Sequence, residues 1–171
     1  MKKGRWLLFV LIFFSVSCIL FGTGEAGNVV DVSRDDPEMN AAIQEAQNTL
    51  DVFIAALQAP KPSQTHFSIK AGFHYGDQGG AEHIWLSDIS YDGNLFKGTI
   101  GNDVYYVPNL KYGDPVTVLR DNISDWMIVE NGKMIGGYTI RVLYCRMSPR
   151  EQKQFLESIK MIIEETCGQN N

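Results

Sequence analysis

The sequence lacks the features that mark several large classes of protein. After residue 26 it has no cluster of lysine and arginine, and it has no internal repeat and no low-complexity segment. Its 15 basic and 20 acidic residues give a net charge of −5 at pH 7. An acidic surface repels phosphate groups and anionic lipid heads. We therefore expect no nucleic-acid partner, and no membrane contact through the folded part of the chain.

Motifs for common catalytic sites are also missing. The three histidines do not stand in an HxH or HExxH spacing, and His66 and His74 bracket one expected strand, about 26 Å apart. We therefore predict no metal ion and no cofactor. The chain has no G-x-S-x-G motif. Ser124, Asp125 and His83 are the one set from which a small hydrolase could be built, with His83 as its general base.

The one long hydrophobic run lies at the N-terminus. Three basic residues within positions 2–5 precede an apolar stretch over 6–21, and small residues follow in "GTGEAG". This order is typical of a secretory signal peptide, and the run is shorter than the roughly 20 residues of a spanning helix. We predict a signal peptide over residues 1–26, cleaved after Ala26, and export to the periplasm or cell envelope.

Two alternatives for this segment stay open. The apolar run could remain as an uncleaved membrane anchor. Cys18 could instead be acylated, because small residues precede it, although Ser15 stands where an aliphatic residue is expected. The apolar "ILF" after Cys18 favours a continuing signal sequence.

Cysteines are few, with Cys145 and Cys167 remaining beyond the signal segment. In an exported protein two such cysteines often pair. However, "SPRE" at 148–151 has the pattern of a capping box, and the apolar spacing that follows predicts one helix over 149–167. Such a helix would hold its ends roughly 27 Å apart, whereas a disulfide needs Cα atoms within about 7 Å. We predict no internal disulfide.

The rest of the chain alternates between two kinds of pattern. A polar lead-in over 27–35 is followed by a helix that Asp36 caps and Pro37 begins, with an apolar stripe at steps of three and four residues. From Phe67 to Met147 the pattern changes to period two, with hairpin turns. The sequence predicts one α+β domain over 36–171: an N-terminal helix, a strongly curved, mostly antiparallel sheet or small open barrel of six or seven strands, and a C-terminal helix.

Two turn dipeptides set the expected register of the hairpins. Asp92-Gly93 would place Trp85 opposite Ile100 and His83 opposite Asn102, with Gly98 diagonal to Trp85. Asn131-Gly132 would place glycines opposite the next tryptophan and its neighbour. It would also pair Asp125 with Tyr138 and Ser124 with Thr139. We interpret the Trp–Gly neighbours as a packing motif made of Trp85, Gly98, Trp126, Gly136 and Gly137.

Three segments carry a family resemblance: "DPEMNAAIQEAQNTL", "AEHIWLSDISYDGNLFKGTIGND" and "ISDWMIVENGKMIGGYTIRVL". From about residue 35 to 147 the chain resembles the YegJ-like family, a domain of unknown function (number 2314). The resemblance implies the fold and the choice of residues, but no reaction. Its members resemble one another as exported or cytoplasmic small domains, sometimes joined to other modules.

The remaining interpretation is binding. We predict a ligand site on one face or edge of the sheet that holds an unknown protein, a peptide or a small polar ligand. Gly136-Gly137 would suit strand addition, although room for Trp126 explains it better. We expect a non-enzymatic binding or interaction module of the bacterial cell envelope, the small hydrolase being the alternative. The candidate ligand-binding residues are Glu82, His83, Asn102, Ser124, Asp125 and Thr139.

Overall fold

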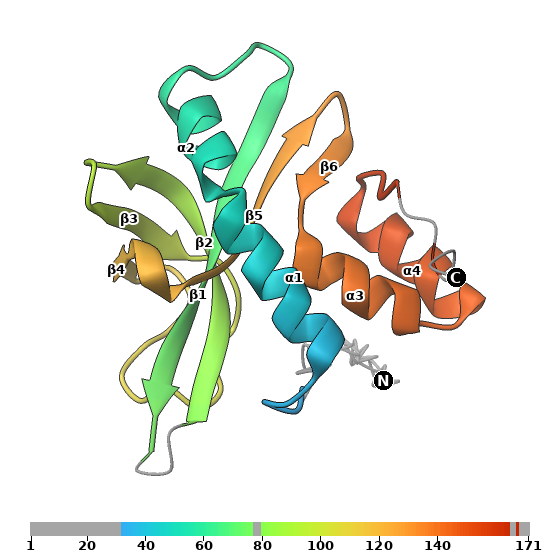
Figure 1. Cartoon of the computed structure of the whole chain (residues 1–171), viewed down its shortest axis with the longest axis horizontal. Coiled ribbons are helices and arrows are strands. Elements are labelled where there is room, and N and C mark those ends of the chain that lie inside the picture. Colours follow the sequence, from blue (N-terminus) through green and yellow to red (C-terminus); the bar gives the residue numbers. More distant parts are fainter. Residues whose placement is uncertain (1–31, 77–79, 165–166, 168–171) are drawn as a thin grey trace, which may run out of the picture.

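The computed structural model describes residues 32–76, 80–164 and 167 (Figure 1). The predicted signal peptide, its cleavage site, Cys18 and the start of the lead-in lie outside these residues. None of the described helices is both long and apolar enough to cross a membrane.

The N-terminal helical segment consists of two helices, α1 (Pro37–Asn48) and α2 (Leu50–Gln58). Asp36 caps α1 by accepting a hydrogen bond from the backbone N–H of Met39 at 3.1 Å, as predicted. The break at Thr49 was not predicted. It lies where the indole N–H of Trp126 donates to the Ala46 carbonyl at 3.0 Å, an oxygen that an unbroken helix would offer to the backbone N–H four residues later.

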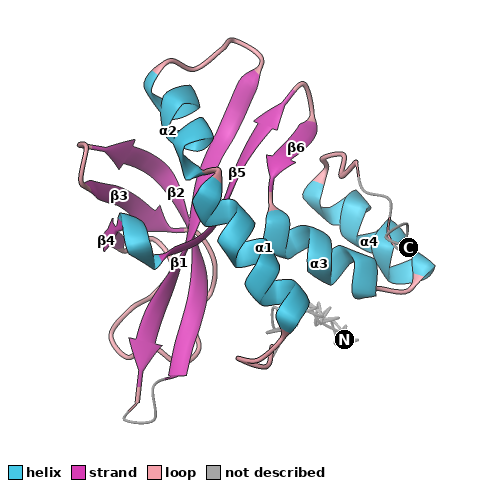
Figure 2. Ribbon diagram, in the orientation of Figure 1, coloured by secondary structure: helices cyan, strands magenta, loops and turns pink. Residues whose placement is uncertain are grey.

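Six antiparallel strands form one open sheet in the order β4-β3-β2-β1-β5-β6 (Figure 2). The short 3-10 helix η1 (Arg120–Asn122) leads into β5, and two helices, α3 (Tyr138–Arg146) and α4 (Pro149–Ile159), follow the sheet. These elements confirm the α+β class. The strands are β1 (Gln64–Tyr75), β2 (Gly80–Tyr91), β3 (Leu95–Ile100), β4 (Pro115–Leu119), β5 (Ile123–Glu130) and β6 (Lys133–Gly136).

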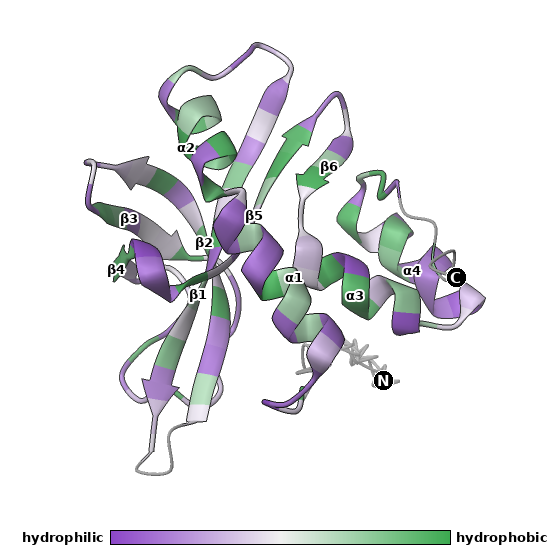
Figure 3. Ribbon diagram, viewed as in Figure 1, coloured by the Kyte–Doolittle hydropathy of each residue, from purple (hydrophilic) through white to green (hydrophobic). Residues whose placement is uncertain are grey.

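The hydrophobic core includes side chains from α1, α2 and five of the strands. Phe53 of α2 is fully buried and its ring lies 5.8 Å from that of Trp126, centroid to centroid. Hydropathy alternates along β1, as the colours of Figure 3 show. Ile69 and Ala71 of this strand are buried in the core, so Lys70 between them belongs to the opposite face.

The predicted register of the first hairpin is wrong. The turn is centred on Gly93-Asn94 instead of Asp92-Gly93, so Tyr91 lies opposite Phe96. A bulge between Ser87 and Ser90, with Asp88 at φ 52°, then changes the pairing by one residue and leaves Leu86, not Trp85, opposite Ile100. The extra residue of such a bulge changes the register along the rest of the pair.

Two further expectations for this region also fail. Asn102 lies beyond the end of β3, so it is not a cross-strand partner of His83. A Cβ on Gly98 would meet the side chain of Ile89 and the backbone of Ser87, not the indole of Trp85. The segment "DVYYV" at 103–107 also predicts a short strand, but the described chain forms a loop over 101–114.

The second hairpin has the predicted register, with Met127 opposite Gly136 across the Asn131-Gly132 turn. Gly136 has φ 74°, and a Cβ there would lie 2.3 Å from the Trp126 carbonyl oxygen. The ring carbons Cε3 and Cζ3 of Trp126 would lie 2.7 and 2.8 Å from that Cβ, so the absence of a side chain at Gly136 leaves room for the indole. The strand ends at Gly136, however, and α3 begins at Tyr138, so the extended strand predicted to continue to Tyr144 is wrong.

The predictions for the C-terminal helix and its cysteines are corrected together. The capping box at Ser148 and Glu151 is present. The helix then ends at Ile159, because Lys160 adopts a left-handed conformation with φ 52°. The chain turns back and pairs with β6 through a bridge between Ile162 and Lys133. This reversal allows a Cys145–Cys167 disulfide, with Cα atoms 5.2 Å apart.

Removing this disulfide is expected to lower the free energy of unfolding by roughly 3 kcal/mol, the chain-entropy value for a loop of this size. The variant Cys145→Ser/Cys167→Ser would be compared with the wild type by urea unfolding. Dithiothreitol should destabilise the wild type and leave the variant unchanged. An oxidised wild type no more stable than the variant would contradict a stabilising cross-link.

Candidate functional site

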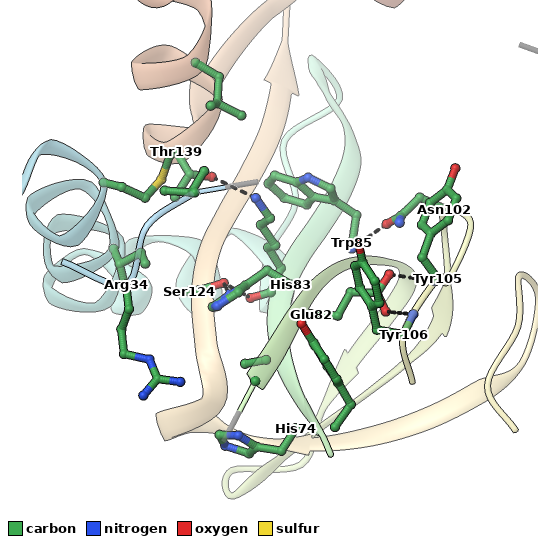
Figure 4. Close-up of a pocket in the computed structure, with 18 of the residues that line it drawn as sticks. Arg34, His74, Glu82, His83, Trp85, Asn102, Tyr105, Tyr106, Ser124 and Thr139 are labelled. Atoms are coloured by element: carbon green, nitrogen blue, oxygen red, sulfur yellow. Dashed lines mark hydrogen bonds between the residues drawn. The ribbon is translucent and has the colours of Figure 1, made fainter. Parts of the chain in front are cut away.

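A cavity of about 730 Å³ opens beside β1 and β2 (Figure 4). Residues 32–34 and the first half of α1 form one wall, and α3 contributes Thr139 and Leu143. The opposite wall includes Tyr105 and Tyr106 from the loop after β3. The cavity therefore lies where four separate parts of the chain meet.

His83 projects from β2 into this cavity, as Figure 4 shows. Its strand partner is Gly72, where a Cβ would lie 3.4 Å from the imidazole ring. Nδ1 of His83 is 2.8 Å from Oγ of Ser124, and that hydroxyl donates to the Lys70 carbonyl at 3.3 Å. Because a carbonyl only accepts, both bonds form together when Nδ1 carries the proton. This assigns Nε2 as an acceptor.

The surroundings of His83 also determine the protonation state of its ring. Partial burial lowers the pKa of His83, and the positive charges of Lys70 and His74 lower it further. The residue as a whole is still exposed to solvent. A lowered pKa leaves the imidazole neutral near pH 7. Nε2 can therefore accept a hydrogen bond or a proton.

Lys70 lies at the centre of a row across three strands, opposite Trp85 on β2 and Asp125 on β5. Its Nζ is 5.7 Å from the centroid of the Trp85 ring and donates to Oγ1 of Thr139 at 3.4 Å. Burial lowers the pKa of Lys70, an effect that Asp125 opposes. Within the described part of the chain, no carboxylate forms an ion pair with this ammonium.

Asp125 is fully buried and caps α3 from outside the helix. The residue before α3 is Gly137, which has no side chain to act as a cap. Asp125 instead accepts the backbone N–H groups of Tyr138 and Thr139 at 3.1 and 2.8 Å, and the Thr139 hydroxyl at 2.6 Å. Burial raises the pKa of Asp125, and these hydrogen bonds oppose the rise.

Glu82 and Asn102 hold the loop wall of the cavity. The Glu82 carboxylate accepts the backbone N–H groups of Tyr105, Tyr106 and Val107 at 2.9 to 3.2 Å. Oδ1 of Asn102 accepts the backbone N–H of Trp85 at 2.7 Å. Both side chains therefore have structural partners, although both line the cavity.

The structure thus divides the six predicted site residues by role. His83 is the one with a free ring edge toward the cavity, while Ser124 orients it from a position that is 3% exposed. Asp125 contacts the start of α3 and makes no hydrogen bond with His83, so these residues do not form a Ser–His–Asp triad. No group of three His, Cys, Asp or Glu residues suited to a metal ion occurs within the described ranges.

Lys70 and Trp85 extend the predicted set. Lys70 was missed, although its place between Ile69 and Ala71 marks a polar position on an alternating strand. Trp85 was interpreted as packing against Gly98, but its ring faces the Lys70 ammonium and lines the cavity.

Comparison with known proteins gives a family and two curated relatives. The model of the family described as "Uncharacterized protein conserved in bacteria (DUF2314)" matches residues 36–161. The chain is 33% identical to "Uncharacterized protein YegJ" of Escherichia coli (strain K12), over 86% of this chain and 95% of that protein.

A second relative is longer. The chain is 32% identical to "Putative ankyrin repeat protein NMB1133/NMB1171" of Neisseria meningitidis serogroup B (strain ATCC BAA-335 / MC58). The match covers 72% of this chain and 51% of that protein. No solved structure matches the chain.

The substitution Asp125→Asn is expected to lower the free energy of unfolding by roughly 2–4 kcal/mol, because an amide cannot accept all the hydrogen bonds that the carboxylate accepts. His83→Ala is the matched control, with an expected loss below about 1 kcal/mol for one partly exposed hydrogen bond. Both are measured by urea unfolding. Equal losses in the two variants would contradict the central role of Asp125.

The stability difference between the wild type and Asp125→Asn is also expected to depend on pH. Because the folded-state pKa of Asp125 is raised, the folded protein binds a proton more readily than the unfolded chain. The contribution of this residue to stability should therefore fall as pH rises from its unfolded pKa through its folded pKa. The stability difference between wild type and Asp125→Asn, followed across acidic pH, should show this slope.

Proposed function

We propose that this chain, which belongs to the family described as "Uncharacterized protein conserved in bacteria (DUF2314)", is an exported module of the bacterial cell envelope that binds a small polar ligand. The observation that carries the proposal is the cavity with the acceptor Nε2 of His83 at its surface. Concave sites with a few oriented polar groups are the usual form of small-ligand sites.

The rigidity of the cavity supports a binding role. Glu82 and Asn102 fix the loop on one side, and Asp125 fixes the start of α3 on the other. Ser124 orients the His83 ring through the hydrogen bond between its Oγ and Nδ1 of the ring. Walls that are ordered before the ligand arrives reduce the entropic cost of binding.

Two independent features support export. The N-terminal sequence has the order of a signal peptide. Cys145 and Cys167 form a disulfide, a bond that persists in oxidising compartments and is rare in the bacterial cytoplasm.

The alternative, a small hydrolase with His83 as its base, has one observation in its favour. The neutral imidazole presents an unprotonated Nε2 to the cavity, where it could accept a proton from a water molecule. Ser124 is a poor nucleophile for such an enzyme because it is buried and its hydroxyl donates to the Lys70 carbonyl.

We expect the chain, expressed with its own N-terminus in a Gram-negative host, to be recovered from the periplasmic fraction without a free thiol. Mass spectrometry of the recovered protein distinguishes cleavage after Ala26 from acylation at Cys18 and from an uncleaved anchor. Recovery from the cytoplasm at full length with reduced cysteines would contradict export.

Ligand binding is expected to depend on the His83 ring. Saturation-transfer NMR with defined mixtures of amino acids, dipeptides, monosaccharides, nucleosides, esters and short carboxylic acids identifies compounds that bind the wild type. His83→Ala should weaken the binding of a compound that offers a hydrogen-bond donor to Nε2 by about fivefold, the effect of one hydrogen bond.

His66→Ala is the matched control, because this exposed histidine lies on β1 outside the cavity. It should leave binding unchanged. Failure of every compound class to bind, or equal binding by His83→Ala, would contradict a ligand site at His83. Consumption of an ester or dipeptide by the wild type and not by His83→Ala would establish the hydrolase instead.

A further inference from the structure

We propose that the ligand of this cavity is an organic carboxylate, whose anionic group lies against the Lys70 ammonium and whose apolar body lies along α1 and α3. This inference rests on the proposed function and names the chemical class of its ligand. It follows from the position of one cation, the charge balance around it and the apolar wall beside it.

The cation is the Lys70 ammonium. Thr139 is an acceptor for it, because the hydroxyl proton of Thr139 is already donated to Asp125. Trp85 supplies an aromatic face, which also favours the charged ammonium. An ammonium has three N–H donors. The two contacts with Thr139 and Trp85 leave donor capacity for a group in the cavity that Lys70 itself lines.

The charge of Asp125 is balanced elsewhere. Its carboxylate accepts hydrogen bonds from the first backbone N–H groups of α3, which form the positive end of the helix dipole. Asp125 still attracts the positive charge of Lys70 but forms no ion pair with it. A buried charge without a direct partner of opposite sign is costly, and an anion in the cavity would lower that cost.

The other titratable groups around the cavity include both signs of charge. They are His83 and Glu82 from β2, His74 from β1, Arg34 from the segment before α1, and Asp103 from the loop after β3. The neutral His83 ring adds no positive charge beside Lys70. Glu82 and Asp103 add negative charges that disfavour a doubly charged phosphate, whereas a carboxylate brings a single negative charge to the Lys70 ammonium.

An apolar wall lies on the helical side of the cavity. Met39 and Ile43 are four residues apart and share a face of α1. Leu143 lies one turn beyond Thr139 on α3, so it is close to the Lys70 partner. A ligand whose carboxylate meets Lys70 can extend an aliphatic or aromatic chain along these three side chains.

The test uses butanoate, hexanoate and octanoate, with 1-octanol and octyl phosphate as probes that change only the head group. Binding to the purified protein is measured by isothermal titration calorimetry. Octanoate should bind more tightly than either probe with another head group. Affinity should rise with chain length, by up to about fourfold per added methylene group.

Lys70→Met should weaken octanoate binding at least about tenfold, as expected for loss of a charged hydrogen bond. It should leave 1-octanol binding unchanged, and Lys70→Arg should restore most of the octanoate affinity. Lys97→Met removes an exposed lysine from β3, outside the cavity, and should have no effect. Urea unfolding of each variant confirms that it is folded.

Leu143→Asn tests the apolar wall separately. It should weaken octanoate and leave butanoate nearly unchanged. Equal octanoate binding by wild type and Lys70→Met would overturn the inference, as would 1-octanol or octyl phosphate binding more tightly than octanoate. If no carboxylate binds while another compound class binds in a His83-dependent manner, the ligand class is wrong and the proposed function stands.

Discussion

The structure depends most on one buried carboxylate, that of Asp125. It accepts hydrogen bonds from the first two residues of α3 and from its own neighbour Trp126. Without it the helix would begin at Gly137 with its backbone N–H groups uncapped in the interior, which is costly. The position of α3, and with it one wall of the cavity, follows from this interaction between a strand and a helix distant in sequence.

The same interaction connects packing to the site. Gly136 and Gly137 both have positive φ, so the chain turns sharply between β6 and α3. Trp126 fills the space against Gly136 and donates to α1 through its indole N–H. On the other face of β5, Asp125 holds Thr139, and Thr139 holds Lys70. Strand β5 therefore contributes Trp126 to the core, and the residue before it, Asp125, to the contacts that form the cavity.

How much the sequence predicts depends on the range of each interaction. Asp36 and Ser148 cap helices through contacts with residues three positions away, and Asn131-Gly132 closes a hairpin, so local rules identify all three. The bulge at Asp88 and the reversal at Lys160 are single backbone conformations without a strong local signal. The displaced turn and the bulge together change the hairpin register, and the reversal at Lys160 brings Cys167 back to Cys145. The His83–Asn102 pairing and the absence of a disulfide were therefore wrong predictions.

The candidate site shows the same difference between residues that local patterns identify and residues that only long-range contacts identify. His83 was identified because the expected register placed it opposite Asn102, a pair that packing did not explain. Lys70 was missed because a lysine at an alternating position is typical of a solvent-facing strand. Lys70 differs from a solvent-facing lysine because Thr139 of α3 contacts its ammonium. Thr139 comes from a helix more than sixty residues later, and the sequence alone gave that segment as a strand. The chemistry of Lys70 therefore became visible only when the helix was placed.

Helix α3 is held at both ends, and one of these restraints is a disulfide whose oxidation state depends on the cellular compartment. Asp125 fixes its start, and the Cys145–Cys167 disulfide joins its last turn to the returning C-terminal segment. Arg146 at its end pairs with Asp36, whose pKa falls to about 2, and thereby joins α3 to the cap of α1. Reduction of the disulfide removes one of these restraints from the helix that carries two cavity residues. An oxidising compartment would therefore favour the ordered wall on which the proposed ligand binding depends.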